Sequence, residues 1–133
     1  MMTPITSLVV SAALAWLMLV VADLAGTRGL SLRGLSRAVG NRDDLPEPSA
    51  FATRADRAAK NMVENLALFG AVLLAAMMAA VPASDLEAPS TIFVISRIVY
   101  AFLYWGGIKY VRTLAWVVSL VGVFWIGSAA ALA

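Results

Sequence analysis

The sequence predicts an all-α fold, a bundle of four helices that crosses a membrane. Of its 133 residues, 62% are hydrophobic and only 14% are charged, and the mean hydropathy is +0.87. A soluble domain of this length could not bury so much apolar surface. The apolar residues gather in four segments, each long enough to cross a hydrocarbon core of ~30 Å. We therefore expect one domain over residues 1–133, with spans at about 5–24, 57–81, 91–110 and 113–132.

The first apolar segment continues without a charge from residue 5 to Asp23. A cleaved signal peptide is the alternative interpretation, but no basic region precedes the segment and its apolar run is too long. The longest connection, residues 26–52, is rich in Gly, Ser, Arg and Pro. This composition predicts a surface segment, with a short helix around Leu32–Val39.

The residue types that are missing restrict the chemistry. The chain contains no Cys and no His. This excludes disulfides, Cys nucleophiles, His bases and the usual zinc ligand sets, so no metal site is expected. Any thiol chemistry must therefore use a thiol that a ligand brings. The formal net charge is only +2, which argues against a nucleic-acid partner.

The basic residues indicate how the bundle is oriented. Nine of the ten lie in segments that meet on one side of the predicted bundle, and the tenth is Arg97. By the positive-inside rule, that side is cytoplasmic and both termini lie outside the cytoplasm. The nine residues are Arg28, Arg33, Arg37, Arg42, Arg54, Arg57, Lys60, Lys109 and Arg112.

Polar residues interrupt the second and third spans at matching depths. Those of the second span are spaced i, i+4 and i+7, and those of the third i, i+3 and i+7, so each set shares one helix face. Antiparallel packing with equal rise places the members of the two sets at the same levels. The pairs expected at one level, from the deepest outward, are Glu64 with Arg97, Asn61 with Tyr100, and Arg57 with Tyr104.

The deepest pair has two interpretations. An ion pair between Glu64 and Arg97 would keep both charges in an apolar bundle, and it could serve only to hold the helices together. Arg57 and Lys60 would then merely extend to the interface, with Lys60 paired to Asp56 on a solvated face. All six polar residues together favour a donor-rich pocket that opens to the cytoplasm, because one pair suffices for cohesion.

Arg112 lies at the start of the fourth span, after Gly106 and Gly107. It could be a simple positive-inside anchor. The functional interpretation makes it the cation that lowers the pKa of a thiol, since the thiolate is the reactive form. The sequence leaves both interpretations open.

Two segments resemble the MAPEG family, the membrane-associated proteins in eicosanoid and glutathione metabolism. Residues 54–69, RADRAAKNMVENLALF, are similar to a family pattern of a basic residue, then Asn, then Glu three residues on, ending in an aromatic residue. Residues 97–104, RIVYAFLY, resemble the family's Arg-x-x-Tyr/His-x-x-x-Tyr motif. The order of the motifs, the four spans and the length of the chain also agree, so the resemblance covers essentially the whole chain.

The resemblance implies a homotrimer of four-helix subunits in a bacterial inner membrane. It also implies that glutathione is held between neighbouring subunits near the cytoplasmic face, with Arg112 as the arginine that stabilises its thiolate. The residues that it implies as glutathione contacts are Arg57, Asn61, Glu64, Arg97, Tyr100 and Tyr104.

Three functions follow as hypotheses. The first is a glutathione-dependent transferase or peroxidase that acts on lipophilic small molecules arriving from the lipid bilayer. The second is a non-catalytic membrane protein whose polar pocket is structural or binds an anion. The third is a small transporter or channel subunit, which the lack of a visible inverted repeat disfavours. Gly70, Gly122 and Gly127 would permit the close helix contacts of an assembled bundle.

Overall fold

The computed structural model of the chain describes residues 1–41, 43 and 45–133. Arg42, one of the nine basic residues predicted on the cytoplasmic side, lies outside the described residues. Within the described part, every regular element is a helix, and four of the five are long and apolar enough to cross a membrane. The all-α, four-helix prediction is therefore confirmed. The helices are α1 (Pro4–Thr27), α2 (Leu32–Val39), α3 (Ala50–Met78), α4 (Ala83–Trp105) and α5 (Lys109–Leu132).

Short polar residues set where the first three helices begin. Thr3, Ser31 and Ser49 each accept a hydrogen bond from the backbone N–H three residues on, which satisfies a free donor of the first turn. The short helix α2 therefore begins and ends where the sequence predicted it. The cap at Ser49 starts α3 seven residues before the expected start of the second span, so Arg57 lies inside the helix.

The turn between α4 and α5 differs from the expectation. The third span was expected to continue to residue 110, but α4 ends at Trp105. The reason is the pair Gly106 and Gly107, the second of which adopts a φ of 78°, a conformation that favours glycine. The backbone carbonyl of Trp105 accepts a hydrogen bond of 3.2 Å from Nε of Arg54, which ties the end of α4 to the start of α3.

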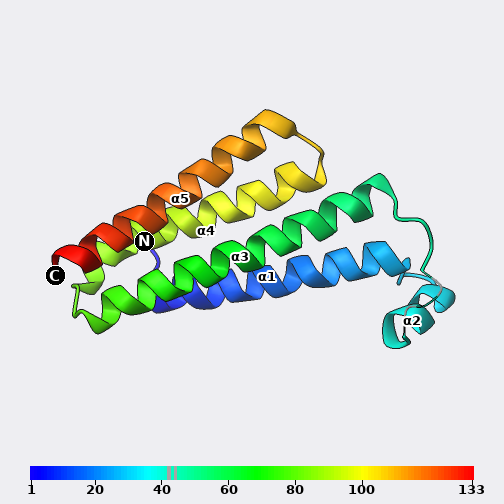
Figure 1. The fold of residues 1–133 in the computed structure, drawn as a ribbon, viewed down its shortest axis with the longest axis horizontal. Helices are drawn as coiled ribbons and strands as arrows, with labels where there is room; N and C mark the ends of the chain where they lie inside the picture. Colours follow the sequence, from blue (N-terminus) through cyan, green and yellow to red (C-terminus); the bar gives the residue numbers. More distant parts are fainter. Residues whose placement is uncertain (42, 44) are drawn as a thin grey trace.

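The four long helices run up and down in sequence order (Figure 1). Helix α1 packs on α3, and α4 packs on α5, while both α1 and α5 also contact the other pair. Both chain termini lie at one end of the bundle, and α2 lies beyond the other end of α1. That other end carries the described basic residues except Arg97. We call it the basic end.

Aromatic and small residues fix how the helices approach one another. The rings of Phe69 on α3 and Phe93 on α4 stack with centroids 4.0 Å apart, in the fully buried core near the termini. Helix α5 approaches the backbone of α4 closely at Gly122, where an added Cβ would lie 2.7 Å from the carbonyl oxygen of Pro89. At Gly127 an added Cβ would meet Val72 at an ordinary 3.5 Å. Gly122 is therefore required by the packing, whereas Gly127 is not.

This difference predicts the stability of two matched variants. Gly122→Ala should lower the free energy of unfolding by ~1–3 kcal/mol, because the added methyl group forces α5 away from the backbone of α4. Gly127→Ala, the control, should be neutral or slightly stabilising, because alanine favours a helix over glycine. Unfolding in mixed micelles, followed by circular dichroism, measures both. Equal stability of the two variants would contradict the close approach at Gly122.

Candidate functional site

A cavity of about 260 Å³ lies where α3, α4 and α5 meet towards the basic end. It brings together Asn61, Tyr100, Tyr104 and Arg112, which are four of the seven predicted site residues. The sequence analysis did not assign a site role to Thr113 or Trp116. Trp116 follows Arg112 by one helical turn, and this i, i+4 spacing was the signal that could have identified it. The lining residues are Asn61, Tyr100, Tyr104, Arg112, Thr113 and Trp116.

Arg97 lies fully buried beside this cavity. Its Nη2 donates a hydrogen bond of 2.9 Å to Oδ1 of Asn61. Its Nε contacts Sδ of Met62 at 3.3 Å. Its guanidinium carbon also lies 4.3 Å from the centre of the Tyr100 ring, a distance at which a cation is attracted to the ring face. Arg97 thus holds one wall of the cavity on α3 and another on α4.

A second cation, Arg112, lies against the other ring of the tyrosine pair. The rings of Tyr100 and Tyr104 meet edge to face with centroids 5.4 Å apart. The guanidinium carbon of Arg112, which is half-buried, lies 4.1 Å from the centre of the Tyr104 ring. The two tyrosines are therefore held between the Arg97 and Arg112 cations, and this contact fixes Arg112 at the cavity wall.

Two buried donors at this place lack a protein acceptor. Nη1 of Arg97 and Nε1 of Trp116 are both buried and have no hydrogen-bond partner among the described residues. Buried donors are normally paired, and leaving one unpaired costs ~1–3 kcal/mol. A ligand that carries several acceptor oxygens would satisfy them, which is the kind of ligand that suits this cavity.

The predicted ion pair between Glu64 and Arg97 is wrong. Arg97 contacts Asn61 and Met62, whereas Glu64 is exposed on the outer surface of α3. The stacking of Phe69 on Phe93 places α3 and α4 within one residue of the expected antiparallel register. The relative depth of the two helices was therefore predicted correctly. The error is in rotation, because α3 turns Met62 and not Glu64 towards α4. The guanidinium of Arg97 then extends about one turn towards the basic end, where Asn61 lies.

Arg57 and Glu64 lie outside the cavity but on the side of α3 that carries Asn61. Both are exposed in the single chain, and helical geometry places them within about 60° of Asn61. Glu64 is the central residue of the 29-residue helix α3. A carboxylate at that depth is costly against lipid. This surface therefore favours contact with protein or water.

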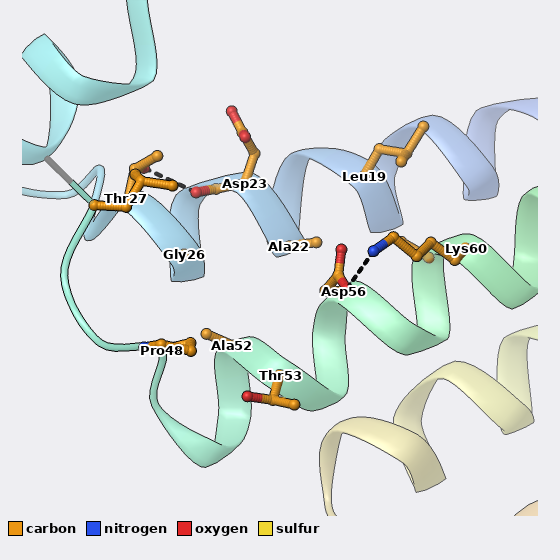
Figure 2. Close-up of a pocket in the computed structure, with 12 residues that line it drawn as sticks. Leu19, Ala22, Asp23, Gly26, Thr27, Pro48, Ala52, Thr53, Asp56 and Lys60 are labelled. Carbon is orange, nitrogen blue, oxygen red and sulfur yellow. Dashed lines mark hydrogen bonds and ion pairs between the residues drawn. The ribbon is translucent and has the colours of Figure 1, made fainter. Parts of the chain in front are cut away.

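A larger cavity of about 470 Å³ lies between α1 and α3, also near the basic end (Figure 2). Nζ of Lys60 and Oδ2 of Asp56 form an ion pair of 2.8 Å at its edge, and both side chains are more than half exposed. This confirms the predicted solvated pair. The hydroxyl of Thr27 donates to the backbone carbonyl of Asp23 at 2.8 Å. This cavity contains none of the predicted site residues.

The fold and the site define the class of protein. The chain is a four-helix protein of the kind that crosses a membrane, with a polar cavity between its helices. A model of the MAPEG family matches residues 4–132, nearly the whole chain. No curated protein and no solved structure matches it significantly. The chain therefore belongs to the MAPEG family, as its two motifs indicated, and members of this family include glutathione-dependent transferases and peroxidases.

The contact between Arg97 and Asn61 predicts a coupling that the expected ion pair would not. Asn61→Ala should lower the free energy of unfolding by ~1.5–3 kcal/mol, because it removes a hydrogen bond to a buried charged group. In a double-mutant cycle with Arg97→Met, the two losses should not add, because the residues are in contact. The matched cycle of Glu64→Gln with Arg97→Met should be close to additive. Strong coupling between Glu64 and Arg97, together with additive losses of stability for Asn61 and Arg97, would contradict the structure.

Proposed function

We propose that the α3–α4–α5 cavity binds glutathione, and that the protein is a glutathione-dependent transferase or peroxidase acting on lipophilic electrophiles. The observation that carries the proposal is the arrangement of donors. Two arginines hold a tyrosine pair between them. Trp116, which lines the cavity, and Arg97, which is buried beside it, each carry a buried donor without a partner among the described residues. Glutathione carries two carboxylates, an ammonium group and a thiol, so its acceptors match this set of donors.

Each residue of the cavity has a separable role in this proposal. Glutathione, when bound, supplies the thiolate that attacks an electrophile. Arg112 stabilises that negative charge, because a nearby cation favours the thiolate over the thiol. Asn61 and Tyr104 bind and orient the peptide. Arg97 positions Asn61 and Tyr100 and offers Nη1 as a further donor. The chain has no Cys or His to act as a base, and an ionised thiol requires none.

The proposal includes a homotrimer with the site completed by a neighbouring subunit. The cavity of about 260 Å³ is smaller than the ~300–1,000 Å³ usual for ligand pockets, so one chain offers only part of a site. Three predicted contacts do not line it: Arg97 is buried beside it, whereas Arg57 and Glu64 are exposed. A neighbouring subunit against this face of α3 would cover their charges and could bring them to the same ligand.

We also propose that the basic end faces the cytoplasm of a bacterial inner membrane, with both termini on the other side. The positive-inside rule carries this orientation, and the helices gather the described basic residues other than Arg97 at one end of the bundle (Figure 1). The cavity then opens near the cytoplasm, where glutathione is available. Lipophilic substrates would reach it sideways from the bilayer.

The role of Arg112 predicts a spectroscopic signature. Wild-type protein with glutathione at neutral pH should show the near-ultraviolet absorbance of a thiolate. Arg112→Ala should lose that absorbance and turnover while it keeps most of its glutathione affinity. Asn61→Ala should instead weaken binding by roughly tenfold or more, from one lost hydrogen bond to a charged group. Lys109→Ala is the matched control, because Lys109 is an exposed cation one turn before Arg112.

Three results would contradict parts of this proposal. Unchanged thiolate absorbance and turnover in Arg112→Ala would make Arg112 only a topological anchor. Glutathione binding without turnover of any electrophile or hydroperoxide would favour the non-catalytic alternative. No binding of glutathione to the wild-type protein would refute the proposed ligand.

The proposed trimer can be tested through its mass and through a substitution at Glu64. Native mass spectrometry in mild detergent should show three copies of the chain. Glu64→Lys should reduce the trimer fraction, because it places the wrong charge at the proposed contact, whereas Lys60→Glu on the solvated face should not. A stable monomer that binds glutathione with full affinity would contradict a site between subunits.

A further inference from the structure

The short helix α2 presents its apolar side chains away from the protein. Leu32, Leu35 and Val39 are spaced i, i+3 and i+7, so they share one face of the helix. Their exposed fractions are 90%, 54% and 81%, respectively. A helix on a globular protein usually buries such a face in the core. None of the described residues covers this face, which predicts a partner outside the part of the chain that the structure describes.

The opposite side of α2 is the one that packs on the protein. Gly34 is buried, and an added Cβ there would lie only 1.7 Å from the backbone carbonyl oxygen of Arg28. Ser31 caps the helix through the N–H of Gly34 at 3.0 Å. Gly34 and the cap therefore fix the rotation of α2 on the end of α1. This rotation directs the apolar face outward, so the exposure follows from the packing.

The apolar surface continues beside the start of α2. Leu30, which precedes the helix, is 96% exposed. It lines a cavity of about 660 Å³ together with Leu24 and Phe51, and Arg28 also lies in its wall. Such a cavity, with an apolar lining and one basic residue, suits an acyl chain next to a negatively charged headgroup.

The charges of α2 itself and of the residues that join it to α1 favour an anionic surface. Arg28 and Arg33 are exposed, and α2 itself contains basic residues but no acidic ones. On the helix, Arg33 lies about 160° from Leu35. An apolar face opposite a basic face, on a helix with little net hydrophobicity, is typical of helices that lie in the membrane interface.

The position of α2 matches the depth of that interface. The apolar run of α1 ends at Asp23, the helix itself ends at Thr27, and α2 begins five residues later. Figure 1 shows α2 beyond the end of α1, to one side of the four-helix bundle. The lipid headgroups begin at the level where the apolar part of a span ends. A helix held at this level and beside the bundle meets lipid.

We propose that α2 is an interfacial membrane anchor, with Leu32, Leu35 and Val39 in the outer acyl region and Arg33 among anionic phospholipid headgroups. The neighbouring cavity takes part of an acyl chain, with the phosphate near Arg28. Basic residues close to an anionic membrane are attracted to its surface. The anchor would hold the connection between α1 and α3 against the bilayer, independently of what the α3–α4–α5 cavity binds.

Single-cysteine spin labelling tests this directly, because the chain has no Cys of its own. The full-length variants Leu35→Cys and Arg33→Cys, one on each side of α2, are labelled and reconstituted into vesicles of phosphatidylcholine with phosphatidylglycerol. The label at 35 should be accessible to oxygen and shielded from a water-soluble nickel chelate. The label at 33 should show the reverse. Val39→Cys repeats the test on the apolar face if the label at 35 disturbs α2.

Two outcomes would overturn the membrane contact. Nickel access at all three positions would place α2 in water. Shielding of positions 35 and 39 from both reagents would mean that protein, such as a second copy of this chain, covers the face.

Changing the lipid or the basic residue tests the role of anionic lipid. Vesicles of phosphatidylcholine alone, or Arg33→Gln added to the Leu35→Cys variant, should lower the ratio of oxygen to nickel access at position 35 severalfold. An unchanged ratio in both cases would overturn the preference for anionic lipid.

Discussion

The buried guanidinium of Arg97 is the constraint on which the site depends. A charge in the middle of an apolar bundle is stable only if polar groups and rings surround it. Here Asn61 supplies an acceptor at 2.9 Å, and the Tyr100 ring lies 4.3 Å away. Satisfying this charge therefore positions one residue of α3 and one of α4. The tyrosine pair extends the arrangement to Arg112 on α5, so that a single buried charge organises three helices around the cavity.

The cost of leaving a charge against lipid also bears on which polar residues face the inside of the bundle and which face a neighbour. Arg97, which finds an acceptor in Asn61 and a ring in Tyr100, faces inward, whereas Glu64, at the centre of α3, faces outward. The single chain thus leaves a charged strip on α3 and an incomplete cavity next to each other. Both would be resolved by one neighbouring subunit, which is why the proposed trimer and the proposed ligand site support one another. The exposed apolar face of α2 differs, because its position beyond α1 points to lipid.

Much of this structure could be predicted from the sequence, and the exceptions have physical causes. Hydropathy predicted the four long helices, the composition of the first connection predicted a short helix around Leu32–Val39, and motif spacing predicted the relative depth of α3 and α4. The partner of Arg97 was missed because α3 is apolar on most of its surface, so its pattern does not say which side faces α4. The early start of α3 and the early end of α4 depend on Ser49 and on Gly107, whose local geometry outweighs hydropathy. Trp116 was missed because an apolar ring in an apolar span stands out only through its i, i+4 spacing from Arg112 and through the unpaired N–H that the structure reveals.

The central claim is that Arg97 organises a cavity that binds glutathione between α3, α4 and α5. Cryo-electron microscopy of the protein in lipid nanodiscs with glutathione would test it most directly. We expect ligand density against Asn61 and Tyr104, with the sulfur beside Arg112 and an acceptor oxygen within hydrogen-bond distance of Nη1 of Arg97. Ligand density in the α1–α3 cavity, or an empty α3–α4–α5 cavity at saturating glutathione, would contradict the account.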